Sequence, residues 1–376
     1  MKVVQVVSGL AWDGGVQEYV SGLSRGLRDV GHEVVILSGG KPPPDGPAPH
    51  ALAEGLDIRW HPKKRLARRY LFPTGLWSSL GDLGSWADVV HVHQPFAVGT
   101  WLAAARRTPL AATLYLHPEH LQGAAAGRRR RQLGLLLRRV DLLVAVSRSE
   151  LELVRSVAEP RRSCVVWPAL SSVPGPRPAR AGRSLVLTVS RLSRSKGLDV
   201  LLPALARLPR AVELAVVGGG PEAERCRTLC REAGRDPDDV LRGESVSDAE
   251  VAALMAQADV FVSASPQESF GIAAMKAMAH GCRAVLSDIP SHREIVTTVG
   301  ADERWLFDPA IDPDGLSRLI MEALEAPPPD ADVAAQIPTW PVSAQRAAEH
   351  YEAMLADRPR RGRRRHRNPD SSSTSR

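Results

Sequence analysis

Short apolar runs alternate with amphipathic stretches along almost the whole chain, and this alternation limits the possible folds more than any other feature. The runs at residues 3–7 and 33–37 are continuously apolar, as expected of strands whose sheet is covered by helices on both faces. Residues 16–30, between them, have helical periodicity. Further strands are expected over residues 89–92, 111–116 and 142–146. Repeated strand–helix units predict right-handed crossovers and a parallel, doubly wound α/β sheet.

The alternation stops once, at residues 173–183, where the segment VPGPRPARAGR is rich in Pro, Gly and Arg and has no apolar period. Such a segment is typical of a linker between domains. The pattern then resumes, with strands expected over 185–190, 213–217, 260–262 and 284–287 and helices over 198–208, 248–256 and 272–279. A chain of 376 residues suits two domains. We therefore expect doubly wound domains at 1–172 and 184–340, with a ligand cleft between them.

Two segments follow the second expected domain. Residues 341–357 have the pattern of a helix that packs back toward the first domain. Residues 358–376 hold eight arginines and one aspartate, which equals the net charge of +7 of the whole chain. This tail is too polar to bury a core, and we expect it to be disordered and solvated. The alternative is a loose contact with anionic lipid or RNA.

Several features favour a reduced, cytoplasmic setting. No apolar run approaches the roughly 18 residues that span a bilayer, and the first ten residues are interpreted as a buried strand. The four cysteines form no CxxC pair. His91 and His93 have the alternate spacing of metal ligands on one strand face, but no third ligand is identifiable, so no metal is expected.

The segment at residues 263–281, SASPQESFGIAAMKAMAHG, is the most informative. It follows an expected strand and begins a helix near Gly271. The backbone amides of Ser269, Phe270, Gly271 and Ile272 would then lie free at a helix N-terminus, which is a favourable place for a phosphate. The alternative is an ordinary strand–helix corner.

A second segment, VSRLSRSKGLDVLL, places Arg191 and Lys196 just beyond the carboxyl end of an expected parallel strand. Ligands bind at this edge of such sheets, and two cations there could neutralise a diphosphate. Solvated surface cations are the alternative. Gly14 and Gly15 offer a further turn before a helix, whereas residues 218–221 do not form a dinucleotide-binding fingerprint.

Together these segments resemble the GT-B family of retaining glycosyltransferases of the GT4-like type, glycosyl transferases group 1. The resemblance covers roughly residues 1–357. It is carried, in the order of the family, by GGVQEYVSGLSRGLRDVGHEVVIL, DVVHVHQP, VSRLSRSKGLDVLL, VVGGGPE and SPQESFGIAAMKAMAHG. It implies an acceptor-binding first domain, a donor-binding second domain and a nucleotide-sugar donor.

The resemblance implies a role for particular residues. Gly15 is similar to the family glycine near the donor phosphates, and Arg191 and Lys196 to the basic pair that holds the diphosphate. The amides of residues 269–272 are similar to those that bind the distal phosphate. His117 resembles a family histidine near the transferred sugar. Neither a cofactor nor a metal ion is implied.

Glu268 matches the first glutamate of the family motif E-x7-E, which is expected near the sugar hydroxyls. The resemblance implies front-face attack in which the leaving phosphate takes the acceptor proton, so no protein nucleophile is nominated. The second glutamate of the motif should stand at position 276, where this chain has Lys276. Lysine only donates hydrogen bonds and cannot accept them from ribose hydroxyls. Three explanations stay open: Lys276 reaches a phosphate, the nucleotide is unusual, or the protein binds without turnover.

The acceptor is the least determined partner. Asp13 and Glu119, with Trp12 and Glu18, are predicted to face the cleft, where acidic groups would suit an amine-bearing aminocyclitol or other natural product. A cell-envelope glycan is the other acceptor class, and a sugar-nucleotide epimerase is an alternative activity. Residues 128–131 are four arginines before an apolar stretch, which predicts a helix with a cationic face. Such a helix allows weak peripheral contact with the inner face of a membrane, although an ordinary surface helix is the favoured interpretation.

Overall fold

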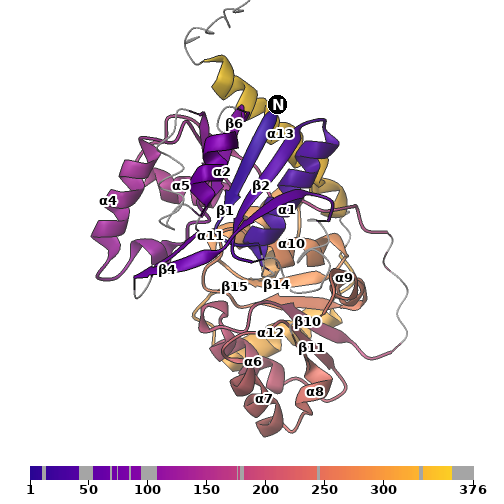
Figure 1. The fold of residues 1–376 in the computed structure, drawn as a ribbon. Coiled ribbons are helices and arrows are strands. Elements are labelled where there is room, and N and C mark those ends of the chain that lie inside the picture. The colour runs from indigo at the N-terminus through magenta and orange to yellow at the C-terminus, as the bar shows by residue number, and fades with distance from the viewer. Residues whose placement is uncertain are drawn as a thin grey trace, which may run out of the picture.

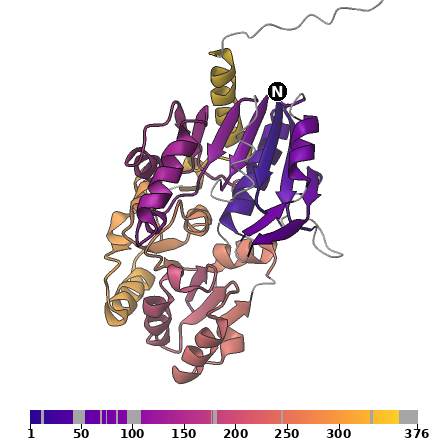
Figure 2. The same cartoon turned by 60° about the vertical axis from the view of Figure 1, so that its left-hand side comes forward.

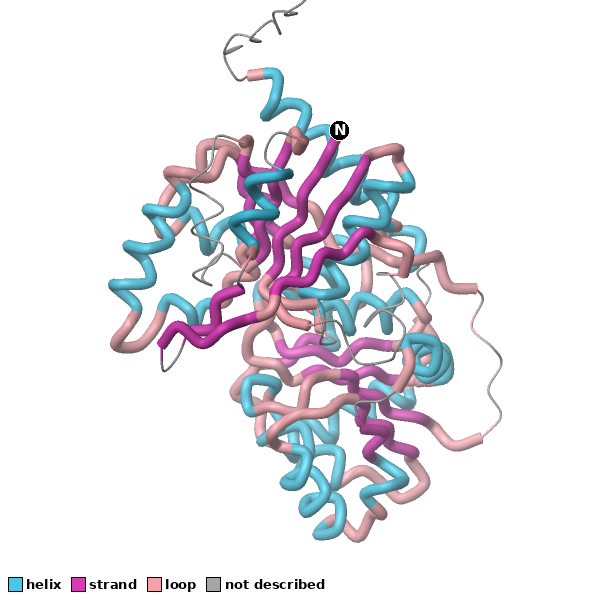
Figure 3. Tube along the Cα trace, viewed as in Figure 1, coloured by secondary structure: helices cyan, strands magenta, loops and turns pink. Residues whose placement is uncertain are grey.

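The chain forms two α/β halves, each built around its own sheet, in the computed structural model of the protein (Figure 1). Figure 3 shows the strands of each half enclosed by helices. The predicted architecture, two parallel sheets covered by helices, is therefore confirmed. The structure describes residues 1–10, 14–41, 54–67, 70–73, 75–83, 86–94, 108–175, 177, 182–243, 246–329 and 333–357.

The first sheet is parallel throughout, in the order β3-β2-β1-β6-β7-β8-β9. Its strands are β1 (Lys2–Val7), β2 (Glu33–Gly39), β3 (Asp57–His61), β6 (Val89–His93), β7 (Leu110–Thr113), β8 (Leu142–Ala145) and β9 (Ser163–Val165). Its helices are α1 (Gly15–Asp29), α2 (Leu76–Leu83), α4 (Ala126–Leu137) and α5 (Arg148–Arg155), with the short 3-10 helix η2 (Pro118–Leu121). An antiparallel hairpin is formed by β4 (Lys63–Ala67) and β5 (Tyr70–Pro73).

The second sheet is also parallel, in the order β12-β11-β10-β13-β14-β15. Its strands are β10 (Leu185–Val189), β11 (Glu213–Val217), β12 (Leu241–Gly243), β13 (Val260–Ser263), β14 (Arg283–Ser287) and β15 (Leu306–Phe307). The helices are α6 (Leu198–Ala206), α7 (Ala223–Glu232), α8 (Pro237–Val240), α9 (Asp248–Gln257), α10 (Ile272–Ala279), α11 (Pro290–Val299) and α12 (Pro313–Glu325). The 3-10 helices are η3 (Arg194–Lys196), η4 (Glu303–Trp305) and η5 (Val333–Gln336).

The chain crosses between the halves twice, and the two crossing segments are hydrogen-bonded to each other. The amide of Leu170 donates to the carbonyl of Pro338 at 2.9 Å, and the amide of Trp340 donates to the carbonyl of Leu170 at 3.1 Å. After the second crossing, α13 (Trp340–Ala356) lies beside α1 of the first half, as Figures 1 and 2 show. The helix begins at Trp340, one residue before the predicted start. The predicted tail, 358–376, lies outside the described residues.

A continuous apolar core joins the halves at this crossing. It includes Tyr19 of α1, Met275 of α10 and Trp340 of α13, all of them buried. The rings of Tyr19 and Trp340 meet edge to face at 5.7 Å. Gly22 and Gly26 of α1 make room for α13, since a Cβ on Gly22 would lie 2.0 Å from the Trp340 ring. Close helix contact therefore depends on the absence of side chains at these two positions.

Candidate active site

The loop between β13 and α10 ends at the N-terminus of that helix. Gly271, just before Ile272, has a φ of 109°, in the left-handed region. A Cβ at this position would lie 3.0 Å from Cδ2 of His292, so both backbone conformation and space favour glycine. The first amides of a helix have no intrahelical partner, so Ser269 to Ile272 offer N–H groups at the positive end of the helix dipole. This geometry suits an anion.

Lys196 and Glu268 meet beside this helix N-terminus. The ammonium of Lys196 lies 2.6 Å from Oε1 of Glu268, and their side chains are only 24% and 18% exposed. Burial alone would raise the pKa of Glu268, but the charges of Lys196 and His292 outweigh it and lower that pKa. The turn that carries Lys196 lies close to the second sheet, and this approach needs glycine at position 197. A Cβ there would lie 1.9 Å from the carbonyl oxygen of Ala264. An ionised carboxylate and a cation are thus fixed at one point.

Arg191 stays apart from this pair. It follows β10 and its guanidinium is exposed. Within the part of the chain that the structure describes, its side chain has no ion-pair or hydrogen-bond partner. The structure therefore brings Lys196, but not Arg191, to Glu268. A free guanidinium at the carboxyl edge of a parallel sheet is available for an anion.

His117 reaches the same loop from the first half of the chain. Its Nε2 lies 3.3 Å from Oγ of Ser269, and its backbone amide donates to Nδ1 of His120 at 3.0 Å. Burial and the neighbouring His120 lower the pKa of His117, so its imidazole is neutral near pH 7. Nδ1 of His117 is buried without a hydrogen-bond partner in the described chain. The structure thus brings His117 and Ser269 together, as a shared site requires.

Two further hydrogen bonds join the halves near His117. Oγ of Ser147 donates to the carbonyl of Ser269 at 2.8 Å, and the amide of Glu119 donates to Oε1 of Gln267 at 2.9 Å. The side chain of Glu119 is exposed beside this contact. Its predicted acceptor role stays a prediction. Asp13, the other predicted acceptor residue, lies outside the described residues.

Glu294 of α11 is a contact between the halves that sequence reasoning missed. Its carboxylate accepts hydrogen bonds from the amides of Arg148 and Ser149 at 2.8 and 3.0 Å, at the N-terminus of α5. It also accepts from the indole of Trp167 at 3.1 Å. The spacing S-x-x-E at Ser147 signals that a helix begins there. Nothing in the sequence signals which carboxylate of the other half lies against it.

Lys276 forms an ion pair with an acidic residue of the first half. Its ammonium lies 2.6 Å from Oε1 of Glu18, and the two side chains are 26% and 12% exposed. Glu18 lies in the first turn of α1, within the helix predicted over residues 16–30. The helices approach closely here, because a Cβ on Gly15 would lie 3.4 Å from Cδ1 of Ile272. Gly15, Ile272 and Lys276 therefore line one contact between α1 and α10.

Glu150 is fully buried beneath the segment that leads to His117. It accepts the amides of Leu116 and Val146, both at 2.8 Å. Tyr115, the residue before Leu116, has a φ of 52°, which is uncommon for a residue other than glycine. Burial raises the pKa of Glu150 to about 7, although its backbone hydrogen bonds lower it. Glu150 therefore holds an unusual backbone conformation in place.

We expect Glu150→Gln to flatten the pH dependence of folding stability between about pH 5 and pH 7.5. A carboxyl whose pKa is raised from 4.5 to about 7 binds more protons in the native state than in the unfolded state over this interval. Its contribution to the free energy of unfolding therefore falls as pH rises, by on the order of 2 kcal/mol. Urea titrations of the wild type and Glu150→Gln at pH 5 and pH 7.5 measure how far the free energy of unfolding changes with pH in each protein. The same change in both proteins would contradict the raised pKa.

His91 and His93 share one face of β6 as predicted, with ring centroids 4.2 Å apart, but hydrogen bonds occupy their nitrogens. The hydroxyl of Tyr351 on α13 lies 2.7 Å from Nδ1 of His91. The hydroxyl of Tyr115 and Oε1 of Gln5 lie 2.9 and 2.7 Å from His93. Burial lowers the pKa of His91 to about 3. The described residues contain no cluster of three or more potential metal ligands, and these histidines belong to a buried polar network.

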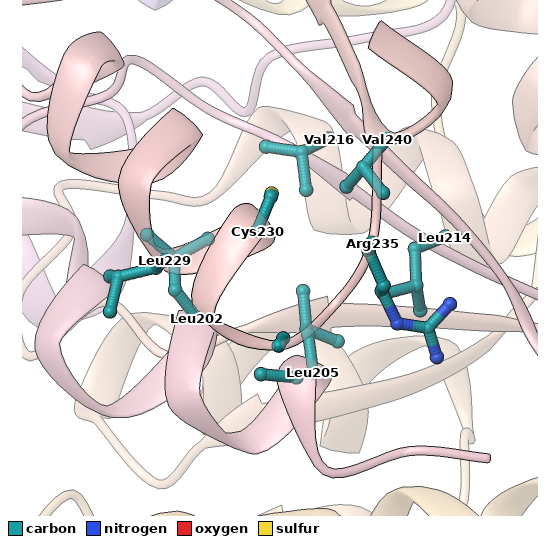
Figure 4. Close-up of a pocket in the computed structure, with 10 residues that line it drawn as sticks. Leu202, Leu205, Leu214, Val216, Leu229, Cys230, Arg235 and Val240 are labelled. Carbon is teal, nitrogen blue, oxygen red and sulfur yellow. The ribbon is translucent and has the colours of Figure 1, made fainter. Parts of the chain in front are cut away.

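A groove of about 440 Å³ lies at the carboxyl ends of β11 and β12. Its lining includes Leu192, Gly218, Gly219, Gly220, Arg227 and Arg242. A second cavity, between α6, α7 and β11, measures only about 10 Å³ and is lined mainly by apolar side chains (Figure 4). It has room for one water molecule at most. Of these two cavities among the described residues, the groove alone is large enough for part of a ligand.

The predicted cationic helix is α4, which carries Arg128, Arg130 and Arg131 exposed to solvent. Leu135 on the same helix is 49% exposed. Contact of this helix with an anionic membrane stays a prediction. Among helices in the described ranges, none has the length and hydropathy that a membrane crossing requires.

Two family models match the chain, one in each half. The Glycosyltransferase Family 4 model matches residues 13–169, and the Glycosyl transferases group 1 model matches residues 175–340. The chain is 30% identical over 336 residues to a phosphatidyl-myo-inositol mannosyltransferase of Mycolicibacterium smegmatis, covering 83% of this chain and 81% of that protein. It is 32% identical over 337 residues to a D-inositol 3-phosphate glycosyltransferase of Xylanimonas cellulosilytica, covering 75% and 77%.

Solved structures share the fold over nearly the whole chain. Sucrose-phosphate synthase from Thermosynechococcus elongatus superposes with a TM-score of 0.67 at 20% identity, covering 95% of this chain and 97% of that one. The pneumococcal O-GlcNAc transferase in complex with UDP and GlcNAc superposes with a TM-score of 0.72 at 13% identity, covering 95% and 99%. At these identities the likeness establishes the architecture.

Proposed function

The chain belongs to the GT4-like group 1 glycosyltransferases, and we propose that it is a retaining enzyme that transfers a hexose-type sugar from a nucleotide-diphosphate donor to an acceptor hydroxyl. One observation carries the proposal: Lys196 and Glu268 pair at the N-terminus of α10, where His117 of the other half also arrives. A cation, a carboxylate and free helix amides at one point suit a ligand with both phosphates and sugar hydroxyls.

The second half, residues 184–340, is proposed to bind the donor. Negative charge accumulates on the leaving diphosphate as the glycosidic bond breaks. Lys196, Arg191 and the amides of residues 269–272 are the groups available to stabilise that charge, and preorganised groups of this kind supply much of the catalysis in enzymes. Because these groups are positive and already in place, we expect donor binding without a metal ion. The groove of about 440 Å³ beside Gly219 is large enough for the nucleoside.

The transferred sugar is proposed to lie between Glu268 and His117. Glu268 would accept hydrogen bonds from sugar hydroxyls, and the neutral His117 would orient the ring. In the proposed step, the acceptor oxygen bonds to the anomeric carbon on the face from which the phosphate leaves. The bond from that carbon to the phosphate oxygen breaks, and this oxygen takes the acceptor proton. Configuration is thus retained without a protein nucleophile.

The first half, residues 1–172, is proposed to bind the acceptor. Glu119 is exposed beside the His117 segment, and with Asp13 it supplies the acidic groups that would face an acceptor. The names of two relatives include inositol, which is a cyclitol. This supports a cyclitol, aminocyclitol or related natural product as one acceptor class. A cell-envelope glycan is the other class.

A protein that binds a sugar nucleotide without turnover is the second candidate. Lys276 favours it, since lysine cannot accept hydrogen bonds from a nucleotide ribose. A sugar-nucleotide epimerase is the third candidate. Product analysis separates the three candidates. A transferase yields a glycosylated acceptor, an epimerase yields isomerised donor, and a binding protein yields neither product.

Isothermal titration of UDP, GDP, ADP and dTDP, with and without magnesium, tests the donor proposal. We expect one nucleotide to bind with essentially the same Kd in both conditions, because Lys196 and the α10 amides replace a metal ion at the phosphates. The result fixes the donor base for acceptor screening. Failure of all four to bind would contradict the proposal, and strict dependence on magnesium would contradict its metal-independent form.

A further inference from the structure

Glu294 of α11 closes the N-terminus of a helix that belongs to the other half. Its Oε1 accepts the amide of Arg148 at 2.8 Å, and its Oε2 accepts the amide of Ser149 at 3.0 Å. The next amide of α5, that of Glu150, donates to Oγ of Ser147 at 3.0 Å. The first amides of α5 are therefore paired, whereas the residue before α10 is a glycine, with no side chain to pair with the amides there.

The same carboxylate also holds Trp167, which packs on the segment that offers amides to a phosphate. We call that segment, residues 269–272, the phosphate loop. Oε1 of Glu294 accepts the indole N–H of Trp167 at 3.1 Å. The ring of Trp167 meets that of Phe270 edge to face at 5.1 Å, and Phe270 is buried. Trp167 thus restricts the position of Phe270 within the phosphate loop, and Glu294 restricts the position of Trp167.

A second path runs from Glu294 to the phosphate loop through the start of α5. Ser147, directly before Arg148, donates its hydroxyl to the carbonyl of Ser269 at 2.8 Å. Because a peptide group is planar and trans, this carbonyl and the N–H of Phe270 point in opposite directions. The hydroxyl of Ser147 therefore sets the direction of the Phe270 N–H, which is one of the donors proposed for the phosphate.

The start of α5 also sets the position of His117. Glu150, in the first turn of α5, accepts the amide of Leu116 at 2.8 Å. Leu116 directly precedes His117, whose Nε2 lies 3.3 Å from Oγ of Ser269. A shift of the N-terminus of α5 would therefore move both His117 and Ser147 relative to the phosphate loop. The carboxylate that closes this N-terminus controls both contacts.

We propose that Glu294 is a positioning residue for the leaving diphosphate of the donor. It holds Ser147 and Trp167 of the first half against the phosphate loop of the second, and these two residues keep the loop amides directed at the distal phosphate. Glu294 acts through them and does not itself contact the donor. This inference rests on the proposed function. The competing explanation is an anchor that only stabilises contact between the halves, which would affect all ligands alike.

Titration of paired nucleoside diphosphates and monophosphates into the wild type and Glu294→Gln separates the two explanations. The pairs are UDP with UMP, GDP with GMP, ADP with AMP and dTDP with dTMP. Glutamine keeps the size of the side chain but turns an NH2 group toward an N–H donor. The wild type should bind one diphosphate at least about tenfold more tightly than its monophosphate, because only the diphosphate reaches the loop amides. The variant should lower this preference about tenfold and change the Kd of the monophosphate less than about twofold.

Glu303→Gln is the matched control, because it removes another carboxylate that is bonded to α11 but belongs to the same half. Glu303 accepts hydrogen bonds from Arg293 at 3.3 Å and Thr297 at 3.2 Å. Its preference for the diphosphate should equal that of the wild type. Equal weakening of both nucleotides by Glu294→Gln, an unchanged preference, or the same loss in the control would overturn the inference and leave the proposed function standing. No diphosphate binding by the wild type would overturn both.

Ser147→Ala gives a second test that does not require Glu294→Gln to fold. It removes the hydroxyl that holds the carbonyl of Ser269, so the preference for the diphosphate should fall about fivefold. The double variant, Ser147→Ala with Glu294→Gln, should match Glu294→Gln alone, because both changes interrupt the same path. A wild-type preference in Ser147→Ala, or losses that multiply in the double variant, would contradict positioning through Ser147.

Discussion

Replacing Lys196 with methionine is expected to lower kcat/KM for sugar transfer by about 10³-fold, mostly through kcat. The change removes a cation that would stabilise the leaving diphosphate. It also leaves Glu268, which lies 2.6 Å from the ammonium, without its compensating charge. Loss of one preorganised group of this kind costs about 10²–10³ in rate, and an uncompensated, partly buried carboxylate adds to that loss. Steady-state kinetics measure the effect, with the nucleotide sugar whose base the isothermal titration identifies as the donor.

Arg194→Met is the control for this variant. Arg194 lies two residues earlier, is 78% exposed and pairs with Glu222 at 3.5 Å, so its loss should change kcat/KM less than about twofold. Equal losses in the two variants would indicate that the turn, rather than the charge at Lys196, is responsible. Wild-type kinetics in Lys196→Met would contradict the proposed role outright.

The same variant should shift the pH profile of the reaction. Lys196 and His292 lower the pKa of Glu268 against the opposing effect of burial. Without Lys196, that pKa rises, so Glu268 becomes protonated at a higher pH than in the wild type. The acidic limb of the kcat/KM profile should therefore move upward. An unchanged limb would indicate that Glu268 does not need its negative charge.

The central strands could be predicted from the sequence because each has a continuous apolar run. Edge strands could not. β3 (Asp57–His61) alternates exposed and half-buried positions, and β12 (Leu241–Gly243) and β15 (Leu306–Phe307) are too short to have a periodicity. An edge strand is defined by the neighbour with which it pairs. That information lies in the folded sheet rather than in the strand itself.

Site features that lie within one strand–helix unit could also be predicted. The free amides before α10 follow from a strand, a turn and Gly271, all local in sequence. Contacts between the halves depend on how two separately folded sheets are placed, and residue type does not encode that placement. Lys276 is therefore visible in the sequence as a departure from a motif, but nothing in the sequence indicates that Glu18 is its partner.

Gly26→Ala is expected to lower the free energy of unfolding by about 2–3 kcal/mol, although alanine is the better helix former. An added Cβ would lie 2.4 Å from the carbonyl oxygen of Trp340 and 2.8 Å from its carbonyl carbon. Because these are backbone atoms, relief requires a shift of α13. That shift would strain the hydrogen bonds between Leu170 and the crossing segment that precedes α13. Packing therefore outweighs the helix preference.

Gly134→Ala on α4 is the matched control, because an added Cβ there meets nothing within 4 Å. It should raise the free energy of unfolding by about 0.5–1 kcal/mol. Urea denaturation followed by circular dichroism measures both variants, and stabilisation by Gly26→Ala would contradict close docking of α13 on α1.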